Sequence, residues 1–179
     1  MTASTFASTP ATTLLFAEAD ATPFSTDPAT LKSWDRARAF LAAAPKVWLT
    51  TVRPDGRPHT APVLLVWADG APCFTSRPDS RKSVNLAGNT HCVISASDDD
   101  LDLVVEGVAA RVGDDTGIRR VADAFKDKYD WEFTVRSGTV TGDPRPGSPE
   151  YAFHRITPAR AFGYGADGLT ATRWRFDGR

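Results

Sequence analysis

The spacing of hydrophobic and polar positions changes near residue 46, from a helical period to the alternation that is typical of strands. Before that point, apolar side chains recur every three or four residues, at Leu31, Trp34, Ala37 and Leu41. This pattern predicts an amphipathic helix that begins at the Thr26-Asp27-Pro28 segment and ends near Pro45. Residues 1–25 are rich in Ala, Thr and Ser without a sustained period, and are predicted to form a flexible arm.

After residue 46, short segments rich in β-forming residues alternate with turn residues. Strands are predicted over residues 47–53, 58–67 and 71–75. The turns between them carry Pro54-Asp55-Gly56 and Ala68-Asp69-Gly70. Because tight turns join antiparallel neighbours, these strands are expected to form an antiparallel meander.

The second half of the chain predicts two helices and further strands. Residues 78–88 predict a short helix, with Asp79 or Ser80 as its N-cap and Gly88 at its end. The remaining predicted elements are strands over 91–97 and 101–112, a helix over 116–129, a loop over 137–149, and strands over 151–157, 160–164 and 170–176.

The long strand predicted over residues 101–112 indicates how the elements are arranged. Its centre is apolar on both faces, so both faces should be covered. A closed or half-closed β-barrel flanked by helices provides that cover. We therefore predict a protein that is mainly β with flanking helices, with one domain over residues 26–179 that follows the arm at residues 1–25.

Composition excludes several classes of function. The formal net charge of -1 provides no basic excess for a nucleic-acid backbone. No apolar run reaches the ~18 residues of a membrane span, and the start of the chain lacks the pattern of a secretory signal. We therefore expect a cytoplasmic protein. The two cysteines, Cys73 and Cys92, are expected to be small buried hydrophobic residues.

The motifs of several enzyme classes are absent from the sequence. It contains neither the Gly-x-Ser-x-Gly elbow of serine hydrolases nor a Walker P-loop. Its histidines, His59, His91 and His154, fall in separate predicted strands and show no metal-ligand spacing. Any difficult chemistry is therefore expected from a bound cofactor.

One segment has the composition of an anion site. Residues 75–83 run from a strand end into a helix start, where free backbone N–H groups attract a phosphate. Hydroxyls at Ser76, Ser80 and Ser83 and charges at Arg81 and Lys82 add donors. The alternative is a solvated helix cap, and the carboxylate of Asp79 counts against an anion site.

Several segments together resemble a known family. They are Leu49 to His59 with Pro62-Val63, Ser80 to Leu86, Val105 to Ala109, and Thr157 to Gly163. In order and spacing they are similar to the pyridoxamine 5'-phosphate oxidase-like superfamily of split β-barrels, and more narrowly to its flavin/deazaflavin (F420)-dependent oxidoreductase branch. The resemblance covers roughly residues 30–179. The Arg-x-Val-Leu-Leu-Lys motif of authentic pyridoxamine phosphate oxidases is absent, so vitamin B6 synthesis is not expected.

This resemblance implies a homodimer that holds coenzyme F420, or alternatively FMN, at the subunit interface. Matched position by position, the cofactor-binding residues are Thr51, Pro62, Val63, Thr75, Ser76, Ser80, Arg81, Lys82 and Asn85. Ser80 stands where relatives often have Arg, and Arg81 is the nearest substitute.

The aromatic residue Trp174 allows two interpretations. Its strand either packs an aromatic face in the core or reaches a cofactor with it, and we include Trp174 among the candidate cofactor-binding residues.

The function expected from the resemblance is hydride transfer between F420 and a small conjugated organic substrate. Three alternatives remain open. One is an FMN-dependent oxidoreductase of the same fold, and another is a non-catalytic protein that binds a flavin, a deazaflavin or haem. The third is a barrel that binds no redox cofactor. No catalytic side chain is assigned, because hydride transfer needs no protein nucleophile.

Overall fold

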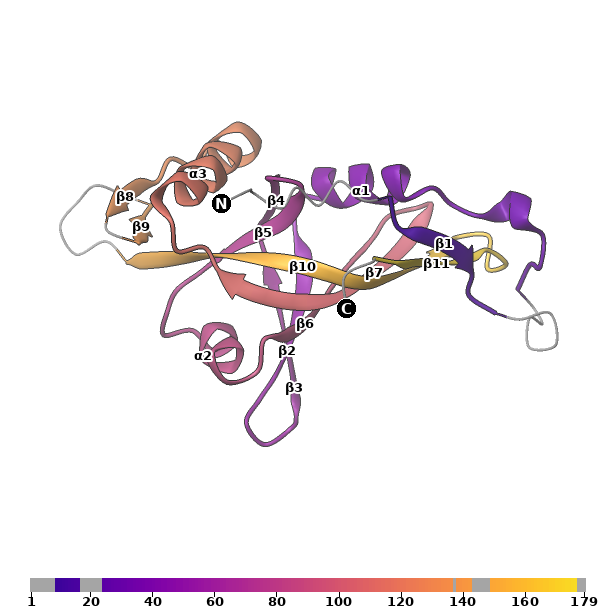
Figure 1. Cartoon of the computed structure of the whole chain (residues 1–179), viewed down its shortest axis with the longest axis horizontal. Helices are drawn as coiled ribbons and strands as arrows, with labels where there is room; N and C mark the ends of the chain where they lie inside the picture. The colour runs from indigo at the N-terminus through magenta and orange to yellow at the C-terminus, as the bar shows by residue number, and fades with distance from the viewer. Residues whose placement is uncertain (1–8, 17–23, 137, 143–148, 177–179) are drawn as a thin grey trace.

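A long antiparallel sheet forms the body of the molecule in the computed structural model, with strand β10 (Glu150–Gly165) along its axis (Figure 1). One edge of β10 pairs with β7 (Leu101–Arg111). The other edge pairs with β5 (Ala71–Ser76) near its start and with β11 (Ala171–Arg175) near its end. The structure describes residues 9–16, 24–136, 138–142 and 149–176.

The other strands extend this sheet on both sides. Its main path runs β1-β11-β10-β7-β6-β2-β3, in which β1 is Ala11–Leu14, β6 is His91–Ser97, β2 is Val47–Val52 and β3 is Pro58–Val63. Off this path, β4 (Leu65–Ala68) pairs with β5, while β8 (Thr134–Arg136) pairs with β9 (Thr139–Thr141), which pairs with β10.

Three α-helices flank the sheet in the described part of the chain, together with a 3-10 turn at Pro28–Thr30. They are α1 (Trp34–Ala43), α2 (Arg81–Gly88) and α3 (Asp115–Tyr129). In Figure 1, α1 and α3 lie on one side of β10 and α2 lies on the other. None of the described helices has the length and apolarity needed to cross a membrane.

The core consists of two clusters that meet at β5 and β10. Phe74 and Ile156 belong to the cluster inside the barrel. Cys73 and Phe153 belong to the cluster beneath α3. Because side chains alternate across a strand, β5 and β10 each contribute to both clusters.

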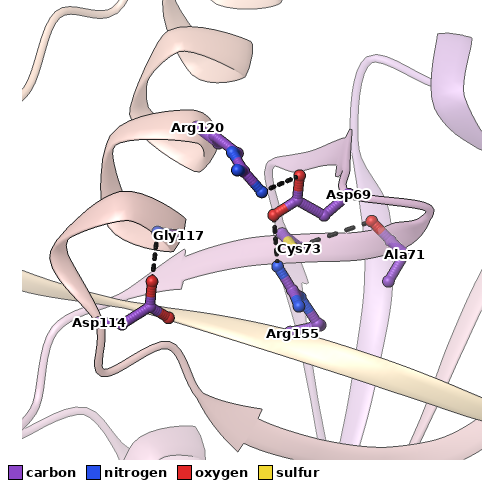
Figure 2. A network of polar contacts seen from close by, with 7 residues as sticks. All are labelled: Asp69, Ala71, Cys73, Asp114, Gly117, Arg120 and Arg155. Carbon is purple, nitrogen blue, oxygen red and sulfur yellow. Dashed lines mark hydrogen bonds and ion pairs between the residues drawn. The ribbon is translucent and has the colours of Figure 1, made fainter. Parts of the chain in front are cut away.

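A polar network fastens α3 over its cluster (Figure 2). Asp69 lies in the β4–β5 turn, and its carboxylate accepts hydrogen bonds from Arg120 of α3 and Arg155 of β10, both at 3.0 Å. Both turn residues have positive φ, 50° at Asp69 and 77° at Gly70, as a tight hairpin turn requires. This turn therefore positions a carboxylate between a helix and the central strand.

The prediction of a mainly β fold with flanking helices is confirmed, but several boundaries were wrong. The predicted flexible arm contains β1, which pairs with β11, while residues 1–8 and 17–23 lie outside the described residues. The first helix begins at Trp34 with Ser33 as its N-cap, because Asp27 and Pro28 instead form the separate 3-10 turn. In both places, local composition gave no sign of the long-range or capping contact that decides the structure.

The strand boundaries also needed correction. The strand predicted over 58–67 is interrupted at Leu64, where the chain leaves β3 and enters β4. The loop predicted over 137–149 contains β9, while residues 137 and 143–148 lie outside the described residues. The strands predicted over 151–157 and 160–164 are one strand, because a bulge between Pro158 and Arg160 takes up the irregularity.

Candidate cofactor site

Three serine hydroxyls meet where β5 ends and α2 begins. The Oγ atoms of Ser76 and Ser80 lie 2.7 Å apart, and Ser83 donates a hydrogen bond of 2.9 Å to Ser76. Ser80 is the N-cap of α2, but its side chain makes no capping bond to the helix backbone. The first turn of α2 therefore presents backbone N–H groups that no N-cap side chain satisfies, beside a cluster of hydroxyls.

Positive charge gathers at the same helix start. Lys82 is half-buried, and this burial lowers the pKa of its ammonium group. Among the described residues, no carboxylate lies within ion-pairing distance of Arg81 or Lys82. The nearby carboxylate of Asp79 pairs with Arg77 at 2.9 Å. The sequence-based objection that Asp79 repels an anion is therefore weakened, because Arg77 neutralises this charge.

His59, on β3, lies within the field of these cations. Burial lowers the pKa of its imidazole, and the charges of Arg53, Lys82 and Arg81 lower it further. The β2–β3 turn and the start of α2 therefore contribute to one electropositive region. A neutral imidazole and several cations are the groups that a phosphate-bearing ligand needs.

Beneath the first turn, α2 is tied to the barrel by a buried polar chain. Asn85 donates through Nδ2 to the hydroxyl of Thr51 at 3.0 Å, and Thr51 donates to the backbone carbonyl of His59 at 3.4 Å. Asn85 is only 2% exposed and Thr51 is fully buried. Thr51 therefore does not line a ligand surface itself, and it orients the Asn85 amide.

Several buried polar atoms around this helix start have no protein partner within the described chain. They are Nδ1 of His59, Oδ1 of Asn85 and Nδ1 of His154. Buried polar atoms are nearly always hydrogen-bonded in proteins, so unpaired ones indicate a missing partner. With the cations and free N–H groups, they fit a polar, phosphate-bearing cofactor. The described residues contain no group of side chains that could hold a metal ion.

The structure brings most of the predicted cofactor residues together. Ser76, Ser80, Arg81, Lys82 and Asn85 share the α2 start and the end of β5. Two further predicted residues lie on β3, where Pro62 is exposed and Val63 is buried in the barrel. Thr75 is paired with Phe153 in the sheet, so it faces the side opposite Ser76.

The prediction that Trp174 binds a cofactor needs correction. Trp174 is fully buried, packs against Trp34, and donates from its indole nitrogen to the carbonyl of Lys32. It pairs with Ala161 on β10, whereas the site at Ser76 pairs with Ala152. At 3.3 Å per residue these pairings are about 30 Å apart along the strand. Trp174 is a core residue.

Sequence reasoning missed the part that histidines play near this site. His59 and His154 were weighed only as metal ligands, yet Lys82 lowers the pKa of both imidazoles. The pairing of β10 with β5, which brings His154 to the site, does not follow from the pattern of either strand alone.

A glycine run elsewhere has the spacing of a dinucleotide fingerprint but not its structure. Gly163, Gly165 and Gly168 follow the Gly-x-Gly-x-x-Gly pattern. Gly163 and Gly165 are the last glycines of β10, and Gly168 lies in the turn to β11, whereas the fingerprint requires a helix after the strand. A Cβ at Gly163 would lie 2.6 Å from the Trp174 ring, so packing against this core residue explains that glycine.

Comparison with known proteins shows the family of the chain. The sequence profile of the pyridoxamine 5'-phosphate oxidase family matches residues 33–164, most of the chain. The chain belongs to the pyridoxamine 5'-phosphate oxidase family. No curated protein matches the sequence significantly.

Solved structures share the fold of this pyridoxamine 5'-phosphate oxidase family member at low identity. A conserved hypothetical protein from Mycobacterium tuberculosis has 20% identity and a TM-score of 0.63, with 80% of this chain and 91% of that one covered. An F420 reductase has 24% identity and a TM-score of 0.51, covering 68% and 92%. An FMN-binding protein from Nostoc punctiforme has 16% identity and a TM-score of 0.53, covering 79% and 87%. The predicted split β-barrel fold is confirmed.

Proposed function

We propose that this protein is an oxidoreductase that moves a hydride between coenzyme F420 and a small conjugated organic substrate, with FMN as the alternative cofactor. The observation that carries the proposal is the start of α2, where unpaired cations, free backbone N–H groups and unpartnered buried polar atoms meet. Family members of this fold include an F420 reductase and an FMN-binding protein, which supports a flavin-type cofactor.

Each part of the site has a role in holding such a cofactor. The hydroxyls of Ser76, Ser80 and Ser83 and the backbone N–H groups of α2 would donate to the phosphate, with Arg81 and Lys82 providing charge. When bound, the flavin or deazaflavin ring supplies or accepts the hydride. The chain needs no nucleophile for this reaction, in agreement with the absence of hydrolase motifs.

The spread of the cations favours F420 over FMN. Arg53 lies close enough to His59 to lower its pKa, as do Arg81 and Lys82. The positive region therefore extends beyond the first turn of α2 to the β2–β3 turn. F420 carries an acidic tail in addition to its phosphate, whereas FMN carries only the phosphate, so the larger cationic surface suits F420 better.

The same proposal includes a homodimer with the cofactor at its interface. Trp48 on β2 is 48% exposed on the outer face of the sheet. The register aligns Trp48 with Pro62 on one side and with Ser95, Val104 and Phe162 on the other. Trp48 and Pro62 are exposed, whereas Ser95, Val104 and Phe162 are half-buried. An exposed tryptophan in a row of mostly apolar side chains suits contact with a second copy. Pro62, a predicted cofactor residue, lies in this row.

A titration tests the choice of cofactor. Purified protein is titrated with F420 and separately with FMN, while the fluorescence of its five tryptophans is followed. Arg119→Ala removes an exposed charge on α3 and serves as the control for Lys82→Ala. F420 binding that Lys82→Ala weakens and Arg119→Ala leaves unchanged supports the proposal. Binding of FMN alone would make FMN the cofactor instead of F420, and binding of neither contradicts the proposal.

Turnover separates the enzyme from a non-catalytic binding protein. Reduced F420 is mixed with the protein and a panel of conjugated acceptors, and its oxidation is followed by absorbance. An enzyme accelerates oxidation with at least one acceptor, and Lys82→Ala slows it through weaker cofactor binding. Tight binding without turnover on any acceptor would favour the storage or shielding function instead.

A further inference from the structure

A buried histidine beside the proposed cofactor site has no ligand contact assigned to it in the function described above. His154 lies on β10, is 7% exposed, and stacks its ring on Phe74 with centroids 5.0 Å apart and planes 8° from parallel. Its Nδ1 is buried and has no hydrogen-bond partner in the described chain. Stacking explains why a flat ring fits here, but a phenylalanine would stack equally well without leaving a polar atom unsatisfied.

The sheet register places His154 on the face that meets α2. His154 pairs with Phe74, and Ala152 pairs with Ser76. Opposite residues of antiparallel strands share a face, as do residues two apart on one strand. His154 therefore shares a face with Ser76, whose hydroxyl contacts the first turn of α2. The separation along the strand is one two-residue repeat, about 6.6 Å.

The charges and burial around His154 agree with this placement and keep the imidazole neutral. The pKa of His154 is about 4, because burial and the charges of Arg111 and Lys82 lower it more than an interaction with the backbone of Ala152 raises it. Arg111 is its partner across the β7–β10 pair, and Lys82 belongs to the first turn of α2. At neutral pH the site therefore contains an uncharged ring next to cations.

The unpaired atoms near α2 differ in what they need from a ligand. Oδ1 of Asn85 is an acceptor, because the amide nitrogen already donates to Thr51. A phosphate dianion has only acceptors to offer, so it cannot satisfy this oxygen. A ligand that satisfies both Asn85 and the cations must carry a hydroxyl or an N–H group next to its phosphate.

We propose that His154 is a ligand-contacting residue, whose free Nδ1 hydrogen-bonds a hydroxyl of a phosphorylated polyol chain held at the start of α2. This inference rests on the proposed function, since both candidate cofactors carry a ribityl phosphate. It adds to that function by assigning a contact to the polyol chain next to the phosphate group. The cations bind the phosphate, and the neutral pair of His154 and Asn85 binds the sugar alcohol.

The test compares two probes that differ only in the polyol. Inorganic phosphate and D-ribitol 5-phosphate are titrated into the full chain, alone and in competition with F420 or FMN. The variants are His154→Phe, which keeps the ring stacking and removes both nitrogens, and His154→Asn, which keeps a polar atom near the position of Nδ1. Circular dichroism and thermal melting check that each variant folds.

The expected results distinguish the polyol contact from a structural role. His154→Phe should weaken D-ribitol 5-phosphate and cofactor binding about tenfold, as for loss of one hydrogen bond, and leave inorganic phosphate unchanged. His154→Asn should recover part of that loss. Unchanged ribitol phosphate binding in a folded His154→Phe overturns the inference, as does an equal loss for inorganic phosphate. Failure of the wild-type chain to bind F420 or FMN contradicts the proposed function separately, because ribitol phosphate still reports on His154.

Discussion

Burial sets the properties of individual ionisable groups in this protein as strongly as neighbouring charges do. It lowers the pKa of Lys82 and is the largest cause of the lowered pKa of His154. It also raises the pKa of the thiols Cys73 and Cys92 to about 11 and about 12. The cysteines therefore remain protonated at neutral pH, although the charge of Arg155 lowers the pKa of Cys73 against the effect of burial.

The buried histidine predicts how stability depends on pH. The pKa of His154 is about 4 in the folded chain against 6.5 as its ordinary value, so the unfolded chain takes up its proton first as the pH falls. The contribution to stability is therefore complete above about pH 6.5 and is lost as the pH falls to about 4, amounting to about 3 kcal/mol. Urea denaturation at several pH values measures this loss of free energy of unfolding. In His154→Phe, the part of the loss that comes from the histidine should disappear. An equal loss in both proteins would assign the dependence to other groups.

The thiols provide a second prediction at this scale. Ellman's reagent should not react with the folded protein at pH 8, because Cys73 and Cys92 are buried and their pKa values are raised. In guanidinium chloride both thiols should react. Cys73→Ala and Cys92→Ala should each lower the free energy of unfolding by about 1 kcal/mol and leave cofactor affinity unchanged. A folded variant that loses activity would reassign that cysteine to the site.

Lys82 provides the residue-scale test of the cofactor site itself. Loss of a charged hydrogen bond in Lys82→Ala should weaken cofactor binding by about 1.5 to 3 kcal/mol. Lys82→Arg keeps the charge and should recover part of the affinity. The dissociation constant is measured by tryptophan quenching, and an unaltered value in Lys82→Ala would remove Lys82 from the phosphate site.

Among the elements, α2 and α3 are each attached to the barrel by polar contacts that local sequence patterns do not show. The prediction of α2 succeeded, because Ser80 and Gly88 mark its ends in the sequence. Its tie from Asn85 to Thr51 joins residues far apart in the chain, and no local period indicates it. The attachment of α3 through Asp69 is equally remote, joining a hairpin turn to a helix.

The break between β3 and β4 shows why strand boundaries were harder to predict. Residues 58–67 read as one continuous strand because their composition is uniformly favourable to strands. In the structure, Lys128 and Tyr129 at the end of α3 both donate hydrogen bonds to the carbonyl of Leu65, and Lys128 also donates to Ala44. A distant helix therefore fixes the point at which the strand turns.

The contacts of Asp69 with Arg120 and Arg155 are expected to contribute to the free energy of unfolding, because they attach α3 to the sheet. Asp69→Asn keeps a side chain that tolerates the positive φ and removes the charge that Arg120 and Arg155 share. We expect it to lower the free energy of unfolding by about 1 kcal/mol, and Asp69→Ala to lower it by about 1 kcal/mol more through backbone strain. Urea denaturation measures both. If Asp69→Asn lowers the free energy of unfolding equally in the wild type and in the Arg120→Ala variant, the charge contact with Arg120 contributes nothing to stability.

For the whole molecule, the sequence was sufficient to predict the class of fold but not the arrangement of the site. Period-two segments and turn residues indicate a barrel because they depend on neighbours along the chain. The partners of β10 do not follow from such patterns: His154 reaches the site only because β5 pairs beside it, and Trp174 is buried only because β11 pairs farther along. The serine and lysine cluster was predictable because strand end and helix start are contiguous in sequence.

The outer face of the sheet predicts how copies of the chain assemble. One chain has a mass of 19.3 kDa, so light scattering coupled to size-exclusion chromatography should give about twice that value for the proposed homodimer. Trp48→Glu places a charge at the most exposed large side chain of this row and should produce monomers. Leu169→Glu is the matched control, since Leu169 is similarly exposed, at 50%, but lies in the β10–β11 turn.

The cofactor extends this prediction from assembly to function. If the site lies at the subunit interface, the monomeric Trp48→Glu chain should bind F420 or FMN more weakly than the wild type, although the α2 residues are intact. Protein concentration should then also matter, because dilution below the dimer dissociation constant weakens cofactor binding by mass action. A wild-type protein of monomeric mass would contradict the homodimer. A monomeric Trp48→Glu that binds the cofactor with unchanged affinity would instead show that one subunit forms the whole site.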